Sequence, residues 1–123
     1  MTTHGYLGID HVQLAAPQGC EDEARSFFGG LLGMKELPKP EALQKRGGVW
    51  FKCGSHELHI GVQDDYIPAV KAHPAFLVRE IEALRGRLLD HGVEIKTDEP
   101  LAGMTRFHIQ DPFGNRLEFV ERH

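Results

Sequence analysis

The chain has few cysteines, little net charge and no long hydrophobic run. Two cysteines in 123 residues cannot build the disulfide framework of a small secreted scaffold, so we expect reduced thiols. A formal charge of −4 gives no basic footprint for nucleic acid or an anionic membrane. No apolar run approaches the roughly 20 residues of a membrane span, and no signal-peptide pattern opens the sequence. We therefore expect a cytoplasmic protein that binds neither nucleic acid nor membrane.

Histidine, in contrast, is abundant, with eight residues in a chain long enough for one compact domain. The chain also repeats one order of elements. Each half predicts a strand, a helix, a short strand, a loop and two further strands. We predict an α+β fold of two βαβββ modules with curled mixed sheets, eight strands and two main helices. The single domain spans 1–123, with a first module at about 5–63, a linker at about 64–72 and a second module at about 73–123.

The expected elements of the two halves follow hydrophobic periodicity and turn residues. A helix begins near Glu21 in the first half and near Ile81 in the second. The strands expected in the first half are 7–14, 34–37, 49–54 and 57–63, and those in the second are 73–78, 93–96, 104–110 and 116–121.

Alternation along the strands assigns side chains to two faces. Because each helix must cover one sheet face, the apolar strand residues form the core. They are Val12, Leu14, Leu58, Ile60, Phe76, Val78, Leu117 and Phe119, with Phe51 and Phe107. The opposite, concave face receives His11, Gln13, Trp50, Lys52, Glu57, His59, His73, Ala75, Arg106, His108, Glu118 and Val120. So polar a face is costly to bury without a ligand, which indicates the wall of a pocket.

Duplication also predicts where a metal ion would bind. Superposing the two halves brings His11 and His73 into one equivalent position, and His59 and Glu118 into another. Imidazoles and a carboxylate are common ligands of divalent ions. We therefore predict a metal site made of His11, His59, His73 and Glu118.

At this point the sequence resembles the vicinal oxygen chelate superfamily, which includes glyoxalase I, bleomycin-resistance proteins and extradiol dioxygenases. The matching segments are "GIDHVQLAAP", "ARSFFGGLLGMKEL", "HELHIGV", "HPAFLV" and "FHIQDPFGNRLEFVE". The resemblance implies that His11, His59, His73 and Glu118 occupy the family's metal-ligand positions. It also implies a homodimer, in which His11 and His59 of one chain meet His73 and Glu118 of the other.

The resemblance further implies an activity. A divalent ion (Zn, Ni, Fe or Mn) chelates two adjacent oxygens of a small substrate as a Lewis acid, and Glu118 moves a proton as the catalytic residue. A glyoxalase-like lyase or isomerase is the function we expect. A metal-free ligand-binding protein of the bleomycin-resistance kind and an extradiol-type dioxygenase are the alternatives. Neither a serine-rich potassium-binding loop nor glutathione-gripping residues can be identified.

Four further residues are expected to line the substrate pocket: Gln13, Trp50, Arg106 and His108. Each has a second interpretation. Arg106 either pairs with an anionic substrate or forms a salt bridge with a neighbouring carboxylate. Trp50 either stacks on a ligand or packs within the protein. His108, like His56, is expected to be a pocket or surface polar group rather than a metal ligand.

Overall fold

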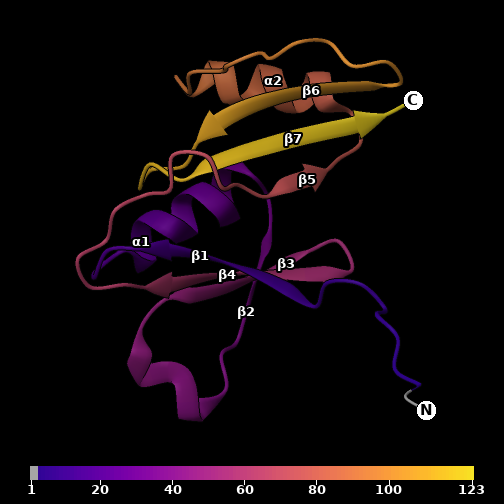
Figure 1. Cartoon of the computed structure of the whole chain (residues 1–123). Coiled ribbons are helices and arrows are strands. Elements are labelled where there is room, and N and C mark those ends of the chain that lie inside the picture. Colours follow the sequence, from indigo (N-terminus) through magenta and orange to yellow (C-terminus); the bar gives the residue numbers. More distant parts are fainter. Residues whose placement is uncertain (1–2) are drawn as a thin grey trace.

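The computed structural model describes residues 3–123, and its strands form two mixed sheets (Figure 1). The first sheet has the order β1 (His11–Ala16), β4 (His56–Val62), β3 (Val49–Cys53) and β2 (Lys35–Leu37). The second has the order β5 (Ala75–Leu77), β7 (Arg116–Arg122) and β6 (Met104–Gln110). In each sheet the first strand of that half runs parallel to its last strand, and the other pairs are antiparallel. The repeated arrangement confirms the predicted α+β fold of two related modules.

One predicted strand is reduced to a single bridge. Residues 93–96 were expected to form a strand, but only Lys96 pairs with the second sheet, through His108 of β6. The two residues exchange both backbone hydrogen bonds, each 2.8 Å long. Pro100 lacks a backbone N–H, and Gly103 has a positive φ of 77°, so the following loop cannot extend the ladder. The second sheet therefore has three strands and one bridged edge.

The helix of the first half differs from a regular α-helix. It starts as α1 (Glu21–Ala24) and continues as the π-helix η1 (Arg25–Leu31). The Leu32 N–H donates to the Phe27 carbonyl, five residues back, at 2.9 Å. The wider turn allows the adjacent Phe27 and Phe28 both to be buried.

Two further helices are present, one in each half. A 3₁₀ helix, η2 (Glu41–Arg46), occupies the loop before β3. Helix α2 (Ile81–Asp90) begins against β7, where the Glu121 carboxylate accepts hydrogen bonds from the N–H groups of Glu80 (3.1 Å) and Ile81 (3.2 Å). A carboxylate at this end satisfies free donors and opposes the positive end of the helix dipole. Within residues 3–123 no helix is both long enough and apolar enough to cross a membrane.

The core joins both halves in one cluster. The predicted core side chains are buried, except that Val12 and Val78 are only partly buried and pack against the cluster. Both cysteines are free thiols, and Cys20 belongs to the core. Arg87 of α2 donates to the carbonyls of Leu31 (2.9 Å) and Gly30 (3.2 Å), so it satisfies the end of the first helix from the second half. The largest fully buried members are Phe28, Val49, Phe51, Leu58, Ile60, Ile81, Leu88, Phe107, Ile109, Leu117 and Phe119.

A buried asparagine adds a polar connection between the halves. The Asn115 amide donates to the Ala15 carbonyl in β1 and to the Asp111 carboxylate, both at 2.8 Å. Its oxygen accepts from the Tyr66 hydroxyl, also at 2.8 Å. Asn115 thus contacts the first half, the connecting segment and the turn before β7. The contact with Asp111 is buried and the other two are partly buried, so leaving these groups without a partner is costly.

Candidate metal centre

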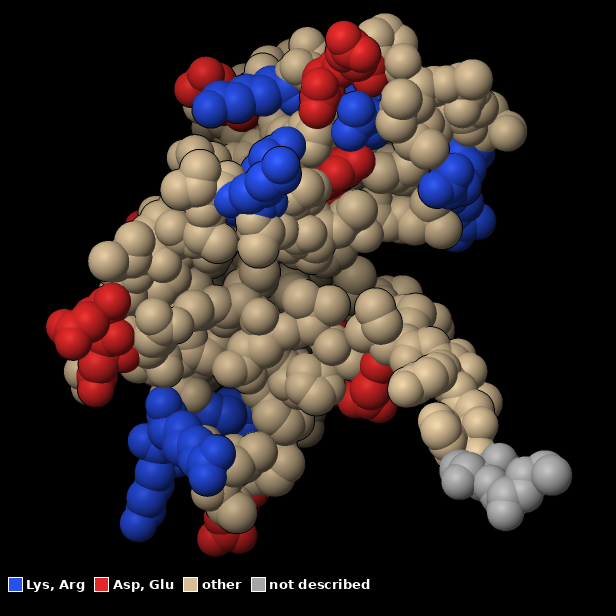
Figure 2. All heavy atoms as spheres, in the orientation of Figure 1, with Lys and Arg blue, Asp and Glu red and all other residues tan. Residues whose placement is uncertain are grey.

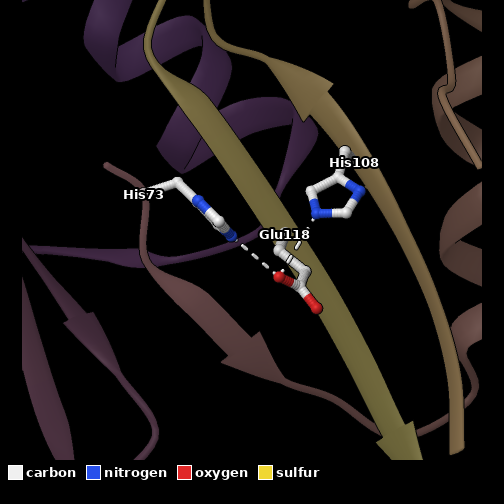
Figure 3. Close-up of side chains that lie close together, drawn as sticks. All are labelled: His73, His108 and Glu118. Atoms are coloured by element: carbon white, nitrogen blue, oxygen red, sulfur yellow. Dashed lines mark hydrogen bonds and ion pairs between the residues drawn. The ribbon is translucent and has the colours of Figure 1, made fainter. Parts of the chain in front are cut away.

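Three side chains from the second half converge on the polar face of its sheet. His73 lies just before β5, His108 is in β6 and Glu118 is in β7, and they point toward one another (Figure 3). Their possible ligand atoms all lie within 4.8 Å of one another. His108 stands directly opposite Glu118 in the β6–β7 register. Alternation had placed both on this face, and the pairing register now makes them neighbours.

A single carboxylate oxygen receives both imidazoles. Oε1 of Glu118 lies 2.9 Å from Nε2 of His73 and 3.2 Å from Nε2 of His108. Side-chain exposure is 23% for His73, 12% for Glu118 and 5% for His108, so the cluster is open to solvent on the His73 side. An open side is what a site needs if a small molecule is to reach a bound ion.

The hydrogen bond made by Nδ1 of His73 determines whether its Nε2 offers a lone pair. Nδ1 of His73 lies 2.7 Å from the Lys71 carbonyl oxygen, which can only accept, so Nδ1 carries a hydrogen. A neutral His73 therefore directs the lone pair of Nε2 at the Glu118 oxygen. Such a contact requires a proton or a cation between the two atoms. A backbone carbonyl on the far nitrogen is the usual way to orient a metal-binding histidine.

Nε2 of His108 can also offer a lone pair, but here the neighbouring group is Arg116. Its Nε2 lies 3.3 Å from the Arg116 guanidinium, which can only donate, so this nitrogen also offers a lone pair. Burial lowers the pKa of His108, and Arg116 and His73 lower it further against the opposing charge of Glu118. A neutral imidazole is the form that binds metal.

Glu118 has the complementary charge state. Burial alone would raise the pKa of Glu118, but hydrogen bonding by His73, the charge of His108 and the contact with Arg106 outweigh it and bring the pKa below its ordinary value. When both imidazoles are neutral, an ionised carboxylate beside their two Nε2 atoms suits a divalent cation. The three residues therefore fit a metal ion, and any of Zn, Ni, Fe or Mn is compatible with this ligand set.

Arg106 and Arg116 surround the cluster with positive charge. Arg106 lies 3.4 Å from Oε2 of Glu118 and 3.5 Å from Oδ2 of Asp98. The structure thus supports the salt-bridge interpretation of Arg106. Basic and acidic side chains are mixed over the second half in the view of Figure 2, so no broad patch of one sign dominates that face.

The first half holds a stack of aromatic rings on its polar face. His59 lies between Trp50, with ring centroids 3.8 Å apart, and His11, with centroids 4.2 Å apart. His59 is 4% exposed, and its Nε2 lies 2.9 Å from Oε1 of Glu57. The stack supports the packing interpretation of Trp50.

The two polar faces are built on the same register. Trp50 pairs with His59, and His59 with Gln13, in the first sheet. His108 pairs with Glu118, and Glu118 with Ala75, in the second. Trp50 and His108 are therefore equivalent, as are His59 and Glu118. Duplication has thus left an aromatic stack in one half and a ligand cluster in the other.

The four predicted ligands fall into two pairs. His73 and Glu118 are in contact, and His11 and His59 are stacked on each other. In the described chain, 3–123, the cluster with ligand spacing contains neither His11 nor His59. Gln13 lines a cavity of about 620 Å³ that His73 also borders. His108, expected only as a pocket residue, joins the cluster.

Comparison with known proteins decides the family. A sequence profile of the glyoxalase/bleomycin resistance protein/dioxygenase superfamily matches residues 8–119. The chain belongs to this superfamily. The resemblance to the vicinal oxygen chelate proteins is thereby confirmed, and the match covers both halves.

Solved structures of other superfamily members share the fold. A glyoxalase family protein from Bacillus anthracis is 52% identical, with a TM-score of 0.95 over 99% of this chain and 100% of that one. A glyoxalase family protein from Enterococcus faecalis is 26% identical, with a TM-score of 0.73 over 94% and 98%. Lactoylglutathione lyase from Agrobacterium tumefaciens is 21% identical, with a TM-score of 0.75 over 96% of each chain, and shows likeness of fold alone. No curated protein matches the sequence.

Proposed function

We propose that this superfamily member is a glyoxalase-like, metal-dependent enzyme acting on a small molecule with two adjacent oxygens. His73, His108 and Glu118 would hold the divalent ion. The observation that carries the proposal is the pair of imidazole nitrogens at 2.9 and 3.2 Å from one Glu118 oxygen, each of which offers a lone pair when its ring is neutral. When bound, the ion supplies Lewis-acid stabilisation of negative charge on the substrate oxygens.

Glu118 is the proposed proton carrier as well as a ligand. Its oxygens differ in their surroundings: Oε1 faces the two histidines, and Oε2 faces Arg106 at 3.4 Å. The lowered pKa keeps Glu118 ionised, the form that can accept a proton from the substrate, and Arg106 contacts Oε2. His73 and His108 keep their ring orientation through Lys71 and Arg116.

His11 and His59 remain proposed ligands, contributed by a second subunit. The cluster of the second half has an open side, and the His11–His59 stack lies on the polar face of the other half. A homodimer in which the first half of one chain faces the second half of the other would unite them. The proposed cytoplasmic location agrees with the two free thiols.

Metal analysis of untagged protein is the main test. We expect one divalent ion per proposed site in the wild-type protein, and His73→Ala, His108→Ala and Glu118→Gln to weaken binding at least about a hundredfold. His56→Ala and Glu41→Gln, both at exposed positions, are the matched controls and should bind as the wild type does. Absence of stoichiometric metal after attempted loading would contradict the enzyme proposal.

That outcome would favour the metal-free binding protein. One observation supports it: Arg106 and Arg116 already contact Glu118 and His108, so the charged cluster has partners without an ion. Ligand binding that survives Glu118→Gln unchanged would then be expected.

Subunit mixing tests the shared site separately. If the site lies between subunits, a mixed dimer of His11→Ala and Glu118→Gln chains contains one intact site and one doubly altered site. Mixing the two inactive variants should therefore restore metal binding in the mixed dimers. If each site lies within one chain, mixing restores none.

A further inference from the structure

A second cavity lies beside the metal cluster. Its volume is about 410 Å³, within the range of small-molecule sites. His108 belongs both to the cluster and to the wall of this cavity. The other wall residues used below are Lys96, Arg116, Pro68, Ala69 and Val70.

The strand register places the two basic side chains next to His108. Lys96 bridges to His108, and His108 pairs with Glu118, so these three residues form one row across the sheet. Cross-strand partners project from the same face. Arg116, two residues before Glu118 in β7, shares that face, and its guanidinium lies 3.3 Å from Nε2 of His108.

These two cations have no acidic partner in the described chain. Among residues 3–123, neither Lys96 nor Arg116 forms an ion pair with a carboxylate. Asp98 also lines the cavity, but Arg106 lies 3.5 Å from its carboxylate. The cavity wall therefore carries two cations that have no carboxylate within ion-pair distance. The apolar residues Pro68, Ala69 and Val70 also line it.

We propose that this cavity binds an anionic group of the substrate through Lys96 and Arg116. A carboxylate, phosphonate or phosphate would suit, because guanidinium groups bind such oxyanions through two parallel hydrogen bonds and ammonium groups add a point charge. The apolar lining residues would contact the carbon portion next to the anion. The inference rests on the proposed function, since it takes the cavity to be an extension of the same site through His108.

Anion binding also has a consequence for His108. Arg116 now donates toward Nε2 of His108, the nitrogen proposed as a metal ligand. A bound oxyanion competes for the same guanidinium and draws it away from that nitrogen. The cavity thus links recognition of one end of the substrate to the availability of the lone pair on Nε2 of His108.

Titration of metal-free protein with simple anions tests the proposal. Calorimetry with inorganic phosphate, methylphosphonate and acetate identifies which oxyanion is bound, after metal removal with a chelator and dialysis. Lys96→Gln and Arg116→Gln should each lower the affinity of the bound probe at least about tenfold, as expected for loss of a charge-assisted hydrogen bond. Lys96→Arg keeps the charge and should retain binding within about threefold.

Matched controls carry the same change elsewhere. Lys45→Gln lies in η2, and Arg122→Gln lies at the far end of β7, and neither lines the cavity. Both should bind the probes as the wild type does. Saturable binding that is lost in the cavity variants supports the inference even if the protein binds no metal, a result that would contradict only the enzyme proposal. Absence of saturable binding for all three probes, or equal losses in cavity and control variants, overturns it.

Discussion

Trp50 and His59 lie face to face, with their ring planes 2° apart. The contact explains why a histidine on the polar face of the first sheet is almost completely buried. His11 covers the other face of the same imidazole. The three stacked rings of the first half occupy the position where the second half carries His73, His108 and Glu118.

Removing the middle ring should destabilise the protein. We expect His59→Ala to lower the free energy of unfolding by about 1–3 kcal/mol, because it removes two ring contacts and leaves Glu57 without its partner. The indole of Trp50 also becomes more exposed, so its emission should shift to longer wavelength. Urea unfolding followed by fluorescence measures both effects.

His56→Ala, on the same strand, is the control. Its side chain is exposed, so we expect a change within about 0.5 kcal/mol and an unchanged spectrum. A His59→Ala protein as stable as this control would show that the stack contributes nothing to folding.

The buried asparagine predicts a second stability effect. Asn115→Ala removes the hydrogen bonds to Ala15, Asp111 and Tyr66, and leaves buried groups of each without a partner. We expect a loss of about 2–4 kcal/mol in unfolding free energy. Tyr66→Phe removes one of these bonds and should cost about 0.5–1.5 kcal/mol. Equal losses in the two variants would mean that the links to Ala15 and Asp111 are not stabilising.

Asp111 should make stability depend on pH. Burial raises the pKa of Asp111, although hydrogen bonds from Asn115, Phe113 and Gly114 oppose the rise. Because the folded pKa exceeds the unfolded value of about 3.9, the contribution of this carboxyl is complete below that value and is lost as pH rises through the folded pKa. The stability of the wild type relative to Asp111→Asn should therefore be greatest in acid and fall toward neutral pH.

Urea unfolding of the wild type and Asp111→Asn, measured from acid to neutral pH, isolates the contribution of Asp111 to stability. The two proteins share all other titrating groups. A relative stability that instead increases with pH would show that the hydrogen bonds outweigh burial and that the folded pKa is depressed.

Gly48 is the position where a side chain is least tolerated. Its φ is +85°, its N–H donates to the Glu21 carboxylate at 2.6 Å, and an added Cβ would collide with the Ile60 carbonyl oxygen. Gly48→Ala should cost about 3 kcal/mol or more, since strain and collision add. Gly54 also has a positive φ (58°) but open space around it, so Gly54→Ala should cost only about 1 kcal/mol. Thermal unfolding of the pair separates collision from backbone strain, and equal costs would exclude the collision.

Much of the fold was predictable because alternation and helical periodicity are local properties. Leu58 and Ile60 are buried as expected, and strand 104–110 has the predicted bounds. The pairing register between strands, in contrast, is not a local property. Alternation placed His108 on the polar face but could not determine which residue of β7 would stand opposite, since that depends on the whole hairpin.

Other differences arise from contacts between segments. The wider turn at Phe27 depends on how two neighbouring aromatic rings enter a core that the other half completes. The predicted strand at 93–96 had suitable residues, but the loop after it leaves the sheet at once. Asp111 and Asn115 looked like ordinary turn residues, because nothing local indicates that the turn is buried against Ala15.

The single bridge between Lys96 and His108 has a dynamic consequence. Its two backbone hydrogen bonds are the only ladder bonds that hold this edge within the described residues, and the 97–103 loop is otherwise tied down by Arg106 and by the His123 N–H, which donates to the Gly103 carbonyl. We therefore expect these amides to exchange with solvent through local opening rather than global unfolding. Because Lys96 forms part of the wall of the cavity beside His108, each such opening widens the route by which a small molecule enters. The singly bridged edge of the second sheet is thus also part of the cavity wall.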